Sequence, residues 1–246
     1  MIKTAVFVEG QTELIFTREL ILKYFEYQDV WVECYTLFND EDLNPTEYSF
    51  PNQEAKCYFQ ILNVGNDNKV LSSILKREKY LFESNRKFDK IIGLRDMYSK
   101  DYREIVKSSK IDERVNEKFI EGHKNVILQK SSYSDKINFH FAIMELEAWL
   151  LGIEYLFKKF NDKLENETIN TTLNIDLSVI DPEKEIFHPA KIVNQILEMV
   201  GDNYSKSKSE INKFMGLITR EDIIQLLGKE KCNTFKEYCK SLNIQK

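Results

Sequence analysis

Carboxylate side chains stand at three places in this sequence where an apolar run comes to its end. "IKTAVFV" runs into Glu9, "KIIGL" leads to Asp96, and "INFHFAIM" is followed by Glu145 and Glu147. Clustered carboxylates repel one another unless cations neutralise them. Carboxylate oxygens are hard ligands that suit Mg²⁺ or Mn²⁺. Two such ions can activate a water and stabilise the leaving oxygen in phosphodiester cleavage, which is the chemistry this pattern favours.

The elements that would position these acids alternate between strand and helix over the first 150 residues. We expect helices over 12–27, 68–85 and 145–160, and strands over 2–8, 30–38, 56–65, 91–94, 125–130 and 137–144. This alternation predicts an α/β fold with a mainly parallel sheet flanked by helices. Ligands of such sheets bind beyond the carboxyl ends of the strands, so Glu9, Asp96 and Glu145 or Glu147 are expected to cluster there.

The chain changes character near residue 160. A polar, loop-rich stretch follows, and short helical patterns begin at Pro189, a residue suited to the first turn of a helix. We therefore predict an α/β domain over 1–160 and a loop-rich segment with a helical C-terminal subdomain over 161–246.

The turn after the first strand contains Gly10 and Thr12. Gly10 is expected to let the backbone turn sharply and to let a phosphate approach closely. Thr12 is expected to cap the helix that follows.

Each of these signals also has a plain structural explanation. A glutamate at a strand end is commonly a solvated loop residue, and Glu145 and Glu147 at a helix start would favour the helix dipole. Periodicity alone leaves the metal site and these explanations evenly balanced.

Composition narrows the class of protein. The 246 residues carry a net charge of −5, which argues against a protein that is basic overall for binding nucleic acid but leaves room for a local basic groove. The four cysteines show no zinc spacing and are expected to be free thiols. We recognise neither a signal peptide nor a membrane-spanning run, and we expect a cytoplasmic protein.

Several motifs together resemble a known family. "VFVEGQTEL" resembles the first motif of Toprim domains, in the form found in overcoming-lysogenization-defect nucleases, and "KIIGLRDMYS" stands at the place of the Toprim D-x-D motif. "FAIMELEAWLLG", "HPAKIV", "NYSKSKSEINKFM" and "CNTFKEYCKSL" are similar to patterns of a bacterial Toprim-like family of unknown function. The resemblance covers most of the chain and implies a Toprim-like, Rossmann-like sheet.

Residue roles follow from this resemblance. Glu9 matches the Toprim glutamate that acts as general base or metal ligand, and Glu13 matches the second acid of the nuclease form. Asp96 matches the first acid of D-x-D. Tyr98 occupies the position of the second acid, so Glu145 or Glu147 is expected to supply the missing ligand.

The resemblance also implies a lysine close to the metals, where it would offset charge on the reacting phosphate. Lys206 is the first candidate and Lys208 the second, although this stretch would also suit a solvated helix start. Lys69 is a lesser candidate for phosphate contact, and Arg95 is expected either to brace Asp96 or to meet a phosphate.

Two functions therefore remain open. The first is a Mg²⁺- or Mn²⁺-dependent nuclease acting on DNA or RNA in an anti-phage or mobile-element setting. The resemblance implies a separate ATPase partner, because the chain has no G-x-x-x-x-G-K-[S/T] loop. The alternative is a non-catalytic binding module on the Toprim scaffold, which Tyr98 favours.

Overall fold

The chain folds into two compact units. The computed structural model describes residues 1–38, 42–106 and 109–246. The first unit comprises Met1–Arg95 and Glu117–Phe141, and the second comprises Asp96–Asn116 and Ala142–Lys246. The chain therefore changes unit three times, whereas the sequence-based boundary at residue 160 divides it once.

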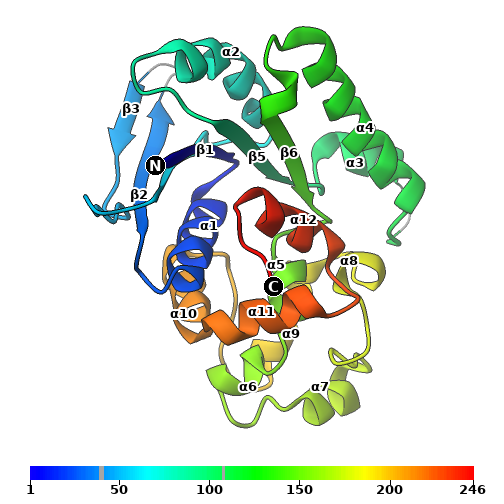
Figure 1. The fold of residues 1–246 in the computed structure, drawn as a ribbon. Helices are drawn as coiled ribbons and strands as arrows, with labels where there is room; N and C mark the ends of the chain where they lie inside the picture. The colour runs from blue at the N-terminus through cyan, green and yellow to red at the C-terminus, as the bar shows by residue number, and fades with distance from the viewer. Residues whose placement is uncertain (39–41, 107–108) are drawn as a thin grey trace. The chain divides into compact units, whose positions relative to one another are not determined.

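The first unit is built on a six-stranded sheet. Its strand order is β3-β2-β4-β1-β5-β6 (Figure 1). The strands are β1 (Ile2–Val8), β2 (Val30–Phe38), β3 (Asp42–Pro45), β4 (Cys57–Asn63), β5 (Lys90–Asp96) and β6 (Ile137–Ala142). β1 pairs in parallel with β4 and β5, and β2 pairs in parallel with β4. The short β3 pairs antiparallel with β2. The mainly parallel α/β class expected from the sequence is confirmed.

The register of the sheet fixes where the strands end. Val8 pairs with Asn63 of β4 on one side and with Leu94 of β5 on the other. The carboxyl ends of β1, β4 and β5 therefore lie along one edge of the sheet. Ligand sites of parallel sheets are found at this kind of edge.

Side-chain alternation along the strands divides the core between two faces. Ala5 and Phe7 of β1 belong to a buried cluster with Ile74 of α2 (Lys69–Glu83) and Ile127 of α4 (Glu113–Lys130). On the opposite side, α1 (Gln11–Tyr24) packs against β2 and β4. The sheet is thus flanked by helices on both faces.

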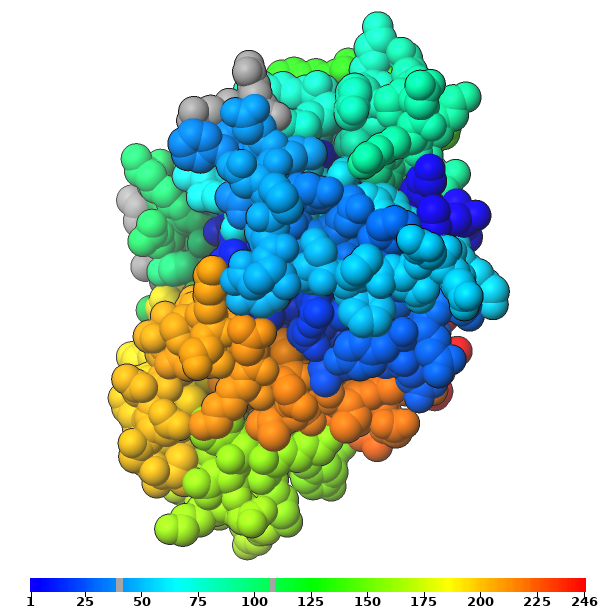
Figure 2. Space-filling model, turned by 90° about the vertical axis from the view of Figure 1, so that its left-hand side faces the viewer, coloured from blue at the N-terminus to red at the C-terminus, as the bar shows by residue number. Residues whose placement is uncertain are grey.

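The second unit is helical in its C-terminal part, as expected. Its helices are α3 (Lys100–Ile105), α5 (Glu147–Gly152), α6 (Leu156–Phe160), α7 (Asn166–Leu173), α8 (Pro182–Glu185), α9 (Pro189–Glu198), α10 (Lys208–Leu217), α11 (Arg220–Gly228) and α12 (Asn233–Ser241). α6 packs against α10 through ring contacts of Phe157 and Phe160 with Phe214. In the space-filling view these two segments, green-yellow and orange, lie side by side (Figure 2).

Three local predictions are wrong. Residues 125–130 belong to α4 instead of a strand, since a short apolar run has the same pattern in a buried strand and on the inner face of a helix. The helix expected over 145–160 is split into α5 and α6, and Tyr155 between them adopts a left-handed conformation with φ 61°. Thr12 does not cap α1, because the helix begins one residue earlier, at Gln11, with Gly10 as its N-cap.

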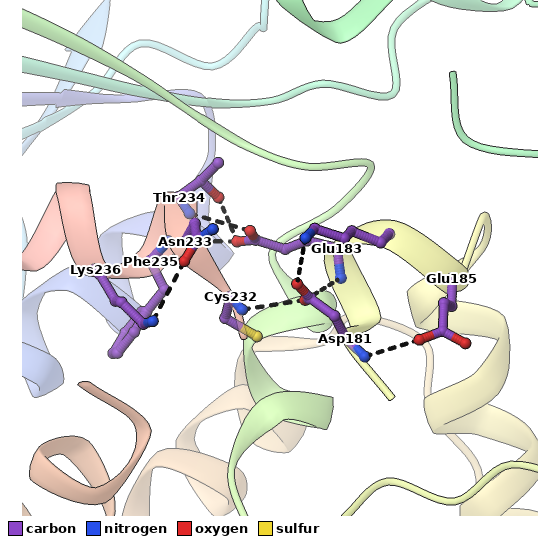
Figure 3. Close-up of polar contacts among 9 residues, drawn as sticks. Asp181, Glu183, Glu185, Cys232, Asn233, Thr234, Phe235 and Lys236 are labelled. Carbon is purple, nitrogen blue, oxygen red and sulfur yellow. Dashed lines mark hydrogen bonds and ion pairs between the residues drawn. The ribbon is translucent and has the colours of Figure 1, made fainter. Parts of the chain in front are cut away.

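A buried polar network fixes α8 to α12 (Figure 3). Glu183 of α8 is 5% exposed and accepts hydrogen bonds from the Thr234 backbone N–H at 3.0 Å, from the Thr234 hydroxyl and from the Trp149 indole N–H at 2.8 Å. Asp181 caps α8 and also accepts the Cys232 N–H at 3.1 Å. The Glu183 carboxylate thus receives a first-turn N–H of α12, where the helix dipole favours negative charge.

Loss of the Glu183 carboxylate should therefore destabilise the protein. We expect Glu183→Ala to lower the free energy of unfolding by about 2–3 kcal/mol, because buried donors lose their acceptor. Urea denaturation followed by circular dichroism measures the change. The control is Glu165→Ala, whose side chain is 50% exposed in an ion pair with Lys158 and should change stability by less than about 0.5 kcal/mol. Equal effects of the two substitutions would contradict a structural role for this network.

Stability should also depend on pH through His140 of β6. Burial lowers the pKa of His140 to about 4, and burial likewise lowers the pKa of His123. Each imidazole therefore takes up its proton at a lower pH in the folded chain than in the unfolded chain, whose histidines titrate near about pH 6.5. Stability should therefore fall as the pH drops from about 6.5 towards 4.

The measurement is the urea midpoint between pH 5 and 7, above the range in which most carboxylates titrate. His140→Gln should reduce the slope, and His123→Gln combined with it should reduce the slope further. Parallel pH curves for the wild type and both variants would refute this assignment.

No helix in the described part of the chain is long and apolar enough to span a bilayer.

Candidate functional site

Three of the predicted acids meet in the second unit around one lysine. Lys206 Nζ lies 2.9 Å from Glu145 Oε1, 3.0 Å from Glu147 Oε2 and 4.0 Å from Asp96 Oδ2. We call Asp96, Glu145 and Glu147 the acid cluster. The structure thus brings together four of the predicted site residues, whereas their roles as metal ligands and catalytic groups stay predictions.

The three acids are presented by β5, by α5 and by the turn between β6 and α5. Asp96 is the last residue of β5, Glu147 is the first residue of α5, and Glu145 lies in the turn between β6 and α5. Asp96 Oδ1 accepts the Leu146 N–H at 2.9 Å, so the end of β5 holds the turn that carries both glutamates. Met144 enters this turn with φ 63°, a left-handed conformation that costs a non-glycine residue about 1–2 kcal/mol.

Each glutamate is also oriented by a residue further along the chain. Glu145 Oε2 accepts the Ala190 N–H at 3.0 Å, in the first turn of α9. Glu147 Oε1 accepts the Tyr204 hydroxyl at 2.7 Å. These contacts leave Glu145 Oε1 and Glu147 Oε2 facing the Lys206 ammonium.

The acid cluster is largely buried, so its charges must be balanced by partners within the protein. The Glu147 side chain is 0% exposed, those of Asp96 and Glu145 are 12% and 15% exposed, and that of Lys206 is 35% exposed. Burial by itself would lower the pKa of Lys206, but the attraction of Glu147, Asp96 and Glu145 outweighs it and raises that pKa above its usual range. The lysine therefore stays protonated, and the cluster holds three carboxylates against one ammonium.

The donor set suits a hard divalent cation. Three carboxylates converge on the point where the ammonium lies, and Glu147 Oε2 receives no hydrogen bond from any described residue. Oxygen ligands of this kind suit Mg²⁺ or Mn²⁺. Among the described residues no group of three or more His, Cys, Asp or Glu side chains has metal-binding geometry. The Lys206 ammonium lies at the point on which the three carboxylates converge.

Glu9 and Glu13 belong to the first unit. Glu9 follows β1 and is half-buried, and Glu13 lies in the first turn of α1 and is 7% exposed. The predicted meeting of Glu9 and Glu13 with the acid cluster stays a prediction.

The structure changes the reason for a glycine at position 10. Gly10 has φ −149°, an extended conformation open to any residue, so the sharp turn does not require glycine. A Cβ atom there would lie 3.0 Å from Glu13 Oε2. Glycine therefore leaves room for the Glu13 carboxylate.

The basic candidates are distributed between the units. Arg95 is 5% exposed in the first unit, where it forms an ion pair with Asp67 at 3.0 Å and lies 3.5 Å from His123 Nε2. Lys69 is exposed at the start of α2, and Lys208 is exposed at the start of α10 in the second unit. Contact of Gly10, Lys69, Arg95 or Lys208 with nucleic acid stays a prediction.

Sequence reasoning assigned no role to Tyr204 or to the first turn of α9, which hold the two glutamates. Tyr204 lies two residues before Lys206, and its phenol and the ammonium contact opposite oxygens of Glu147. The Y-x-K spacing in "NYSKSKSE" was the available signal. The contact of the Ala190 N–H with Glu145 could not be predicted from the sequence, because every residue except proline carries a backbone N–H.

A family model described as a domain of unknown function, DUF4276, matches residues 8–242. The chain belongs to this family. The matched segment includes all of the acid cluster and Lys206. No curated protein and no solved structure gives a significant match.

Removing the lysine should leave the DUF4276 acid cluster without its internal cation. We expect Lys206→Met to lower stability by about 1–3 kcal/mol, less than for a fully buried pair because the lysine is 35% exposed. Added Mg²⁺ should then raise the melting temperature of the variant, because a bound cation stabilises the folded state. Differential scanning calorimetry with and without Mg²⁺ measures both effects.

The matched control is Lys158→Met in α6, whose exposed ion pair with Glu165 spans 2.7 Å. This control should lose less than about 0.5 kcal/mol and show no added response to Mg²⁺. If Lys206→Met behaves like the control in both measurements, the acid cluster neither needs Lys206 nor accepts Mg²⁺ in its place.

Proposed function

We propose that this DUF4276 protein is a Mg²⁺- or Mn²⁺-dependent nuclease that hydrolyses phosphodiester bonds of DNA or RNA. The observation that carries the proposal is the convergence of Asp96, Glu145 and Glu147 on one position, which the protonated Lys206 ammonium occupies. A carboxylate set with a nearby fixed positive charge suits the cleavage of an anionic ester.

The roles of the residues follow from their contacts. Asp96, Glu145 and Glu147 would hold the metal, which when bound acts as a Lewis acid and lowers the pKa of water. Tyr204 and the Ala190 N–H keep the two glutamates oriented, through bonds of 2.7 Å and 3.0 Å. Lys206 would give up its place among the acids and turn its ammonium to the phosphate, where it offsets the developing charge.

The Toprim resemblance assigns further roles. It gives Glu9 the role of general base or metal ligand and Glu13 the role of a metal ligand. It also implies a separate ATPase partner and an anti-phage or mobile-element setting. These assignments belong to the proposal.

A second candidate is a non-catalytic binding module. Two observations favour it: Tyr98 stands where a second aspartate is expected, and the Lys206 ammonium holds the central position of the acid cluster. Under this proposal the lysine permanently replaces the metal, and the scaffold binds a partner or nucleic acid without cutting.

Cleavage assays separate the two proposals. Purified protein is incubated with plasmid, single-stranded DNA and tRNA in Mg²⁺, Mn²⁺ or EDTA, alone and with any ATPase that its genomic neighbourhood encodes. For the nuclease we expect metal-dependent cutting that falls by about 100-fold or more in Asp96→Asn and Glu147→Gln, since each removes charge from the ligand set. Glu9→Gln tests the role implied by the resemblance.

The matched control is Asp101→Asn, an exposed acid in the first turn of α3, which should cut like the wild type. Absence of cutting in every condition, together with no heat of Mg²⁺ binding in calorimetry, would replace the nuclease by the binding module. Equal cutting by Asp96→Asn and Asp101→Asn would remove the acid cluster from the mechanism.

A further inference from the structure

Three aromatic rings gather in the second unit beside the acid cluster. Tyr98 follows β5, while Phe187 and His188 lie between α8 and α9. The Tyr98 ring centroid is 5.8 Å from that of Phe187 and 5.3 Å from that of His188, and Phe187 and His188 are 4.7 Å apart. All three are partly exposed, so the group, which we call the aromatic cluster, is not a closed piece of core.

Backbone hydrogen bonds tie the aromatic cluster to the acids. The Tyr98 N–H donates to the Met144 carbonyl at 2.8 Å, next to Glu145. His188 is the N-cap of α9, and the Ala190 N–H in the same turn donates to Glu145 Oε2 at 3.0 Å. The rings are therefore held at a fixed place next to the turn that carries Glu145.

A pocket of about 360 Å³ continues from these rings. Phe187 and His188 line it, together with four isoleucines and the polar groups of Asn174, Glu185, Lys191 and Gln195. The volume falls in the range of about 300–1,000 Å³ typical of small-molecule sites. The Glu185 carboxylate accepts the Asp181 N–H at 3.1 Å. Apolar walls with two amides, one amino group and one carboxylate suit a flat heterocycle with hydrogen-bonding edges.

The chemistry of this surface matches a nucleobase. Aromatic side chains stack on base faces, and Asn and Gln amides can pair with base edges. Lys191 is exposed at the pocket, and the exposed Arg103 lies over the Tyr98 ring at 5.4 Å, so two cations are available to backbone phosphates. In a duplex both faces of each base are already stacked, so only an unpaired base can enter such a pocket.

We propose that the aromatic cluster and the adjoining pocket form a subsite for an unpaired base, which makes single-stranded nucleic acid the substrate class. The proposal rests on the nuclease function in taking nucleic acid as the ligand. It also gives Tyr98 a role: the residue that stands at the expected acid position contributes a stacking ring in place of a metal ligand.

Binding without cleavage tests the subsite separately from the nuclease activity. Wild-type protein in EDTA is titrated into fluorescein-labelled 15-nucleotide single-stranded DNA, single-stranded RNA and the corresponding duplexes, and anisotropy is recorded. We expect a single strand to bind at least about tenfold more tightly than its duplex. A strand containing 2-aminopurine should lose fluorescence on binding, because stacking on aromatic rings quenches this base.

Variants identify the rings and the pocket as the cause. Phe187→Ala and His188→Ala should each weaken single-strand binding by about tenfold and restore 2-aminopurine fluorescence. Lys191→Glu changes an exposed residue, should leave folding intact, and should weaken binding by a similar factor. Tyr155→Ala, an aromatic of the same unit that is 52% exposed and lies outside the pocket, is the control and should bind like the wild type.

Several results would overturn the subsite. These are equal affinity for single strands and duplexes, wild-type binding by both His188→Ala and Lys191→Glu, or unquenched 2-aminopurine in the bound wild-type complex. Binding of a free mononucleotide with no binding of strands would also overturn the placement on a nucleic-acid path. Failure of the nuclease proposal is a different outcome: no metal-dependent cutting, whatever the binding assays give.

Discussion

The charge of Glu147 is the constraint on which the rest of the second unit depends. Its side chain has no exposed surface, and an ionised carboxylate removed from water requires a cation and hydrogen bonds nearby. Lys206 supplies the cation at 3.0 Å and the Tyr204 hydroxyl supplies the hydrogen bond at 2.7 Å. Both residues come from the short stretch ahead of α10, so this stretch must pack against α5 before the carboxylate has its cation and its hydrogen bond.

Two residues of the backbone near the acid cluster adopt an unfavourable conformation. Met144 and Lys206 both have left-handed conformations, with φ 63° and 60°. Neither is a glycine, so each conformation costs about 1–2 kcal/mol, which the surrounding contacts must offset. Such strain is concentrated at sites where a side chain must point in one direction, which agrees with a functional role for the turn before Glu145 and for the Lys206 loop.

The nuclease and the binding-module proposals differ in whether the Lys206 ammonium or a divalent cation occupies the acid cluster. An ammonium and a divalent cation are attracted to the same three carboxylates. A metal carries twice the charge but must shed water, whereas the lysine is tethered and already in place. Under the nuclease proposal a metal would displace the ammonium, and the displaced lysine would meet a phosphate, whereas under the binding-module proposal the ammonium would stay in place.

The buried hydrogen-bond network of Glu183 and Asp181 helps to position the aromatic cluster. Glu183 and Asp181 fix α8 to the start of α12, and α8 leads directly into Phe187 and His188. The aromatic cluster is therefore held from two sides, by this network and by the bonds of Tyr98 and Ala190 to the turn around Glu145.

The sequence by itself determined the α/β class and the parallel strands predicted at 2–8 and 91–94, and it named Asp96, Glu145 and Glu147 among the candidate metal ligands. It could do so because strands and charged residues at their ends leave local patterns in residue type and spacing. It misread 125–130 as a strand because a six-residue apolar run has no distinguishing period. Only the tertiary structure decided that Lys206 fills the point on which the acids converge, that Ala190 and Tyr204 orient the glutamates, and that Tyr98 joins Phe187 and His188. These contacts join residues that are 45 to 110 positions apart, through backbone groups, ion pairs and ring packing that no local pattern encodes.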